Sequence, residues 1–122
     1  MASKCLLVED DPGYRKSVAR LLKQYCDLEI TEAPDAIRAL RILHQNPNQF
    51  DILVTDEVMP VGPTGMVLLE IAKERWPVMR RVLLSGFTNS EQVHSGIADA
   101  VLDKIFDRRL IATKICRLAK SR

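Results

Sequence analysis

The stretch FDILVTDEVMPVGPTG, residues 50–65, decides the fold of this chain. It opens with a short apolar run, Phe50 to Thr55, which is typical of a buried strand. Asp56 follows the run directly, and a loop rich in proline and glycine comes next. A charge at the end of a buried strand indicates that the strand delivers Asp56 to a site at the edge of a sheet.

The same alternation of short apolar runs with segments of helical period extends along the chain. The predicted strands are Lys4 to Val8, Leu28 to Ala33, Phe50 to Thr55, Val82 to Ser85 and Ala100 to Leu102. The predicted helices begin at the Asp11-Pro12 cap and run to Tyr25, then cover Ala36 to Gln45, Gly65 to Arg75, a short Ser90 to Ile97, and Asp107 to Lys120. Right-handed crossovers between such strands place helices on both faces of a parallel sheet. We therefore predict a three-layer, doubly wound α/β fold with five parallel strands and a shortened fourth helix.

Composition favours one globular domain. The chain has 122 residues, of which 47% are hydrophobic and 28% charged, with a formal net charge of +2. We predict one domain over residues 1–122, which is either complete or part of a longer regulator. No apolar run is long enough to span a bilayer, and the N-terminus does not resemble a signal peptide. These features predict a cytoplasmic protein with no membrane partner and no direct binding to nucleic acid.

The cysteines and histidines do not form a recognisable ligand pattern. Cys5, Cys26 and Cys116 are odd in number, far apart and without a CxxC pair, so they predict buried or incidental thiols rather than a disulfide framework or a zinc site. His44 and His94 fall within predicted helices and lack the spacing of metal ligands.

Polar residues instead gather at the carboxyl ends of the predicted strands, where open α/β sheets bind ligands. These residues are Glu9, Asp10, Asp56, Ser85 and Lys104. If the first and third strands are neighbours, three carboxylates meet there and require a cation to offset their repulsion. Oxygen donors without nearby histidine or cysteine favour Mg²⁺, or Mn²⁺, over zinc or iron.

A carboxylate, a metal, a hydroxyl and an ammonium together indicate acyl-phosphate chemistry. Asp56 would be the nucleophile toward a phosphoryl group. Ser85 and Lys104 would bind the remaining phosphoryl oxygens.

With these residues at its strand ends, the chain resembles the receiver domains of two-component response regulators. The motifs LLVEDDP, LVTDEVMP, VLLSG and DKIF occur in the order found in that family, and the resemblance covers essentially the whole chain. It implies a flavodoxin-like fold with Asp56 as phosphoacceptor. It also implies a metal bound by Glu9, Asp10, Asp56 and the backbone carbonyl of Val58, with Asp10 favoured over Glu9 as a direct ligand.

The resemblance further implies a signalling role rather than that of an enzyme. The phosphoryl donor would be a sensor histidine kinase or a histidine phosphotransfer protein, and phosphorylation would switch binding to a downstream partner. Such a domain could also catalyse its own magnesium-dependent phosphorylation and dephosphorylation.

The chain departs from the family pattern at several positions. Ile105 follows Lys104 where the family usually has proline, so we predict either a trans peptide bond or visible strain. Val101 stands where an aromatic switch residue is common. The loop from Pro60 to Gly65 is one residue longer than usual, and the segment from Ser85 to Lys104 is shorter.

Two alternatives differ in their sequence requirements. One is a degenerate receiver-like module that binds partners without being phosphorylated, which the departures at Ile105 and Val101 favour. The other is a hydrolase that uses an aspartyl-phosphate, such as a haloacid-dehalogenase-like phosphatase, but this class wants a second aspartate where Val58 stands. Dinucleotide binding is disfavoured further, because no GxGxxG follows the first strand.

Overall fold

The structure is a computed structural model that describes residues 3–86 and 96–120. Its strands are β1 (Ser3–Val8), β2 (Leu28–Ala33), β3 (Ile52–Asp56), β4 (Arg80–Ser85) and β5 (Ala100–Asp103). Its helices are α1 (Pro12–Tyr25), α2 (Ala36–Gln45), α3 (Gly65–Arg75) and α5 (Arg108–Lys120). Most of the short helix predicted at Ser90 to Ile97 lies outside the described residues.

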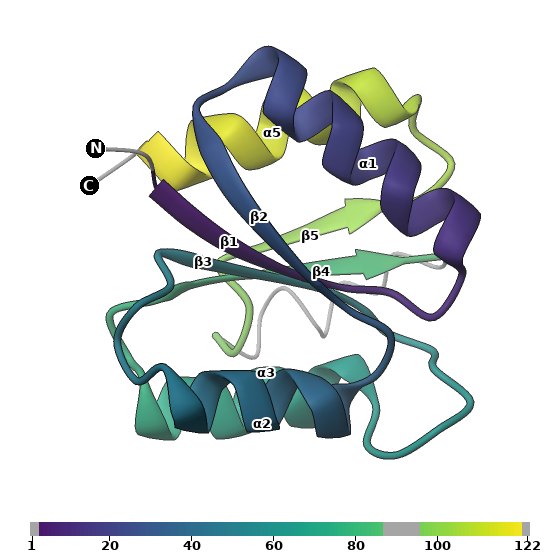
Figure 1. Ribbon diagram of the computed structural model, residues 1–122. Helices are drawn as coiled ribbons and strands as arrows, with labels where there is room; N and C mark the ends of the chain where they lie inside the picture. Colours follow the sequence, from purple (N-terminus) through teal and green to yellow (C-terminus); the bar gives the residue numbers. More distant parts are fainter. Residues whose placement is uncertain (1–2, 87–95, 121–122) are drawn as a thin grey trace.

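All strand pairs are parallel, and the order across the sheet is β2-β1-β3-β4-β5. Helices α1 and α5 cover one face of the sheet, while α2 and α3 cover the other (Figure 1). The predicted three-layer, doubly wound architecture is therefore confirmed.

The central strands are apolar on both sides because both faces of the sheet are covered. Successive side chains of a strand point to opposite faces. Leu7 of β1 accordingly packs with the buried residues of α1 and α5, whereas Leu6 and Val8 pack with those of α2 and α3. The core is thus two apolar layers separated by the sheet, and it leaves the strand ends as the place where polar groups can gather.

Side-chain caps set where three helices begin. Asp11 accepts hydrogen bonds from the backbone of Gly13 and Tyr14, and Asp35 accepts one from Arg38 at 2.8 Å. Thr64 caps α3 in the same way, although the sequence pattern did not reveal it. Each cap satisfies a backbone N–H that would otherwise lack a helical partner.

Three sequence predictions need correction. Strand β4 begins at Arg80, two residues before the predicted Val82. Strand β3 begins at Ile52 rather than Phe50 and includes Asp56 itself. Cys26 and Cys116 are not free thiols, because they form a disulfide although they lie 90 positions apart. The prediction failed because the end of α1 and the last turns of α5 become neighbours only after both helices pack on the same face of the sheet. Cys5 is a buried free thiol, as predicted.

No helix in residues 3–86 and 96–120 combines the length and apolarity needed to cross a membrane.

Candidate functional site

The predicted site residues lie where β1, β3, β4 and β5 end at the same edge of the sheet. The register pairs Val8 of β1 with Thr55 of β3, so Glu9 and Asp56 follow next to each other. One carboxylate oxygen from each of Glu9, Asp10 and Asp56 lies within 4.8 Å of the other two. The neighbouring first and third strands thus produce the acidic cluster that the sequence predicted.

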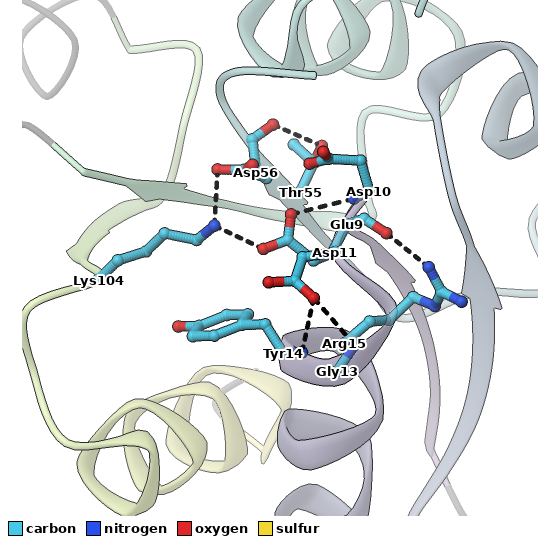
Figure 2. A network of polar contacts seen from close by, with 9 residues as sticks. All are labelled: Glu9, Asp10, Asp11, Gly13, Tyr14, Arg15, Thr55, Asp56 and Lys104. Carbon is cyan, nitrogen blue, oxygen red and sulfur yellow. Dashed lines mark hydrogen bonds and ion pairs between the residues drawn. The ribbon is translucent and has the colours of Figure 1, made fainter. Parts of the chain in front are cut away.

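Lys104, just beyond β5, joins this cluster through its ammonium group (Figure 2). Its Nζ lies 3.2 Å from Oδ1 of Asp56 and 2.5 Å from Oε1 of Glu9. The Lys104 backbone N–H donates to the carbonyl of Ser85 at 2.9 Å, which ties the lysine loop to the end of β4. One cation therefore links two carboxylates that belong to different strand ends.

Glu9 is the most enclosed carboxylate of the site, with a relative exposure of 1%. Oε1 accepts from Lys104, and Oε2 accepts from the backbone N–H of Asp10 at 3.0 Å. The Glu9 carbonyl accepts from the guanidinium of Arg15 at 2.8 Å. Both carboxylate oxygens of Glu9 are engaged, whereas the Asp10 side chain is exposed, so Asp10 is better placed to bind an ion directly.

Burial changes the proton affinities within this cluster. It raises the pKa of Glu9 to about 7, although the hydrogen bond from Lys104 opposes part of this effect. Burial alone would lower the pKa of Lys104, but the hydrogen bond to Glu9 and the charge of Asp56 outweigh it and raise that pKa. The ammonium form of Lys104 is thus favoured in the folded chain.

The donor set fits a hard divalent cation. Every side-chain donor in the cluster is a carboxylate oxygen, and Mg²⁺ prefers oxygen ligands. Asp10 and Asp56 would hold such an ion. Val58, whose carbonyl the family resemblance adds to the ligands, is 76% exposed. When bound, the ion would supply positive charge that offsets the negative charge of the carboxylates and of a phosphoryl group.

The end of β4 places Ser85 beside this cluster. Leu84 is the register partner of Asp56, so Ser85 lies one residue farther along the adjacent strand, and it is 4% exposed. The structure thus brings Glu9, Asp10, Asp56 and Lys104 into direct proximity and sets Ser85 on the neighbouring strand end.

Sequence reasoning did not identify three further residues near the acceptor. Tyr14 lies with its ring centroid 4.6 Å from the Lys104 ammonium, and Arg15 holds the Glu9 backbone. Gly65 begins α3 against the backbone of Asp56, where an added Cβ would lie 2.0 Å from the Asp56 carbonyl oxygen. Only Gly65 had a sequence signal, because glycine destabilises a helix and often marks a close approach of backbone.

The departures from the family pattern have local structural outcomes. None of the peptide bonds in the described part of the chain is cis, so the Lys104–Ile105 bond is trans, one of the two predicted outcomes. The Ile105 side chain is 80% exposed. Val101 packs, partly buried, against the apolar layer between the sheet and helices α2 and α3. The longer loop turns at Gly62, which has a φ of 78°.

Comparison with known proteins places this geometry in a family. The family described as "Response regulator receiver domain" matches residues 5–116. The hydrogenase transcriptional regulatory protein HoxA of Cupriavidus necator is 32% identical over 95 residues, which is 78% of this chain and 19% of that protein. The two-component response regulator ARR18 of Arabidopsis thaliana is 32% identical over 101 residues, covering 82% of this chain and 15% of that protein. This chain therefore spans less than a fifth of the length of these two relatives.

Solved structures agree on the fold. The non-phosphorylated HemR receiver domain from Leptospira biflexa superposes with a TM-score of 0.87 at 22% identity, covering 98% of this chain and 96% of that one. Because the family match covers residues 5–116 and the acidic cluster lies at the strand ends, this chain belongs to the response regulator receiver domain family.

Proposed function

We propose that residues 1–122 form a receiver domain that accepts a phosphoryl group on Asp56 and thereby switches its binding to a partner. The observation that carries the proposal is the position of the Lys104 ammonium, which lies between Asp56 and Glu9 in a cluster that also contains Asp10. A fixed cation beside a reactive carboxylate stabilises the charge of a phosphoryl group.

The transfer step follows from these positions. A carboxylate oxygen of Asp56 attacks the phosphorus of a phosphohistidine, and an O–P bond forms as the P–N bond breaks. The leaving imidazole nitrogen keeps the electron pair of the broken bond. Lys104 and Ser85 bind the transferred oxygens, and Asp10, Asp56 and the Val58 carbonyl would hold Mg²⁺, or Mn²⁺, whose positive charge would offset the negative charge of the phosphoryl oxygens. Glu9 keeps Lys104 in place.

The surroundings of this step are part of the proposal. The donor is a sensor histidine kinase or a histidine phosphotransfer protein, and the domain works in the cytoplasm. HoxA is named a transcriptional regulatory protein, and the match to this chain covers 19% of its length. The downstream partner is therefore either an output domain of a longer chain or a separate protein.

The test is intact mass after incubation with Mg²⁺ and acetyl phosphate. We expect one phosphoryl adduct in the wild type, none in Asp56→Asn, and none when a chelator removes the metal. Glu70→Gln, which changes an exposed carboxylate on α3, should behave like the wild type. No adduct on a folded wild type would favour the degenerate interaction module, and an adduct retained by Asp56→Asn would refute the assignment of the acceptor.

A further inference from the structure

Helices α1 and α5 pack side by side on one face of the sheet (Figure 1), and one covalent bond joins them. The joint is the disulfide between Cys26, the C-cap residue of α1, and Cys116 of α5. We propose that this disulfide is a reversible redox site, opened and closed by exchange with a dithiol, whose state controls how firmly α5 and the Lys104 loop are held.

The disulfide lies within reach of a small thiol. Cys26 is 9% exposed and Cys116 7%, and two shallow cavities open beside them. The first, of about 170 Å³, is lined by Ser3, Cys26, Asp27, Leu28, Cys116, Ala119 and Lys120. The second, of about 310 Å³, is lined by Tyr25, Thr113, Cys116, Arg117 and Lys120. Of these two cavities, both border Cys116 and only the first borders Cys26, so a thiolate that enters either of them reaches Cys116.

The charges around Cys116 favour exchange at this sulfur. Arg117 and Lys120 line the second cavity, so an approaching thiolate meets positive charge. The same side chains stabilise the Cys116 thiolate once the bond opens. Reactive cysteines typically occupy such electropositive, partly accessible positions.

The exchange balances as two successive displacements. A thiolate of the dithiol attacks Sγ of Cys116, a mixed disulfide forms, and Sγ of Cys26 leaves with the electron pair and takes up a proton. The second thiolate of the dithiol then attacks the dithiol sulfur that is bonded to Cys116 in the mixed disulfide. This displaces the Cys116 thiolate, which is also protonated. The chain gains two electrons and two protons, and the dithiol becomes a disulfide. A disulfide oxidant reverses both steps.

The reduced chain keeps the contacts needed to stay folded. Sγ of Cys26 lies 3.3 Å from the Leu22 carbonyl, which can accept a hydrogen bond from the free thiol. Val18, Leu22, Ile111 and Ile115 are fully buried in the apolar layer on this face of the sheet. Free cysteines also pack well among apolar residues. Opening the bond therefore loosens the helix pair without removing its apolar contacts.

The opposite end of the same helix pair borders the acidic site. Arg108, the first residue of α5, lies over the Tyr14 ring at 5.4 Å and donates to Oγ of Ser17 at 3.4 Å. The ammonium of Lys104 also lies over the Tyr14 ring, 4.6 Å from its centroid. When the Cys26–Cys116 disulfide opens, α5 can move relative to α1, and this movement changes how Lys104 is held. The effect on phosphorylation rests on the proposed function, whereas the bond and the loop can be measured without it.

The first experiment measures the bond in the folded chain. The protein is equilibrated at set ratios of reduced to oxidised dithiothreitol, treated with N-ethylmaleimide and weighed intact, with circular dichroism recorded in parallel. We expect two labels to appear together while the spectrum stays that of the folded chain. Cys5 stays unlabelled because burial raises its pKa to about 12. Labels that appear only after denaturation would overturn the proposal.

Single variants test the point of attack. Cys26→Ser leaves Cys116 free, and we expect it to react with a small aromatic disulfide about fivefold faster or more than Cys116→Ser, which leaves Cys26. Equal or reversed rates would overturn the assignment of Cys116 as the attacked sulfur.

Hydrogen exchange tests the coupling. We expect peptides that cover residues 103–111 to exchange several-fold faster in the reduced chain, while peptides from α3 are unchanged. The double variant Cys26→Ser/Cys116→Ser should match the reduced wild type in both buffers. Identical exchange in the two redox states of the wild type would overturn the coupling.

Discussion

At the residue scale, the ammonium of Lys104 is held by groups from three separate elements. Asp56 belongs to β3, Glu9 follows β1, and Tyr14 lies in the first turn of α1. The family usually has proline after this lysine, and here Ile105 stands in its place. The contacts of Lys104 thus constrain its side chain where the adjoining backbone lacks the rigidity of proline.

Glu9 makes stability depend on pH. The pKa of Glu9 rises from 4.5 to about 7 on folding, so the folded chain binds this proton more tightly than the unfolded chain. The contribution is fully present below about pH 4.5 and is lost as the pH rises through about 7. We expect it to reach on the order of 1 to 3 kcal/mol. Urea unfolding in chelator-containing buffer at pH 5 and pH 8 measures the difference.

Glu9→Gln is the variant that isolates this effect, because glutamine keeps a hydrogen-bond acceptor for Lys104 and does not titrate. We expect a smaller fall in unfolding free energy from pH 5 to pH 8 than in the wild type. Glu70→Gln should retain the wild-type fall. Parallel pH curves for Glu9→Gln and the wild type would contradict the assignment.

Tyr14 holds Lys104 through its ring rather than its hydroxyl. The buried hydroxyl has no hydrogen-bond partner within the described residues, so Tyr14→Phe should change the unfolding free energy by less than about 0.5 kcal/mol. Tyr14→Leu removes the cation–π contact, worth about 0.5 to 1 kcal/mol, and should slow adduct formation with acetyl phosphate roughly two- to fivefold. Equal rates for the two variants would show that the ring does not position Lys104.

At the element scale, the start of α3 is set against the acceptor strand. The Gly65 backbone N–H donates to the Glu57 carbonyl at 3.0 Å, and Thr64 caps the helix from the preceding position. This close approach leaves no room for a side chain at Gly65. Helix α3 and the backbone of Asp56 therefore form one packed unit.

Gly65→Ala tests this packing. The added Cβ would lie 2.0 Å from the Asp56 carbonyl oxygen and 2.8 Å from its carbonyl carbon, so backbone must move. We expect a loss of about 1 to 3 kcal/mol in unfolding free energy, measured by chemical denaturation. Gly86→Ala is the matched control, because no atom of the described residues, other than those of its chain neighbour, lies within 4 Å of a Cβ there. Equal stability of the two variants would contradict the tight contact.

The elements also differ in how far the sequence predicted them. Helix α1 was predictable because Asp11 and Pro12 mark its start and its apolar residues recur at helical spacing. The start of β3 was misplaced by two residues because the aromatic Phe50 extends the apolar run across Asp51, yet both residues precede the paired segment. Local patterns indicate that an element exists, but hydrogen-bond pairing determines its ends.

At the scale of the whole molecule, the disulfide closes a chain segment with a sequence separation of 90. A cross-link of this span restricts the unfolded chain and stabilises the fold by about 2 to 5 kcal/mol. We expect reduction, or the double variant Cys26→Ser/Cys116→Ser, to lower Tm by roughly 8 to 20 °C for a domain of this size. Thermal unfolding followed by circular dichroism measures this change.

The double variant also serves as the control, because its Tm should not respond to reductant. An oxidised wild type that unfolds at the same temperature as the double variant would contradict the stabilising role.

The sequence by itself determined the fold class and the residues of the acidic cluster with its lysine. Each of these features is local: an apolar run ends at a defined residue, and that residue lies at the carboxyl end of its strand. Glu9, Asp10, Asp56 and Lys104 could therefore be named before their partners were known.

Only the tertiary structure decided which distant groups touch. Because β1 and β3 are adjacent, the carboxylates of the acidic cluster lie close together. The packing of α1 against α5 brought Cys26 and Cys116 together. The same packing placed Tyr14 beside Lys104. Such contacts depend on the order of strands and on which face each helix covers. The same sequence of helices and strands could be arranged in other topologies, in which these residues would not meet.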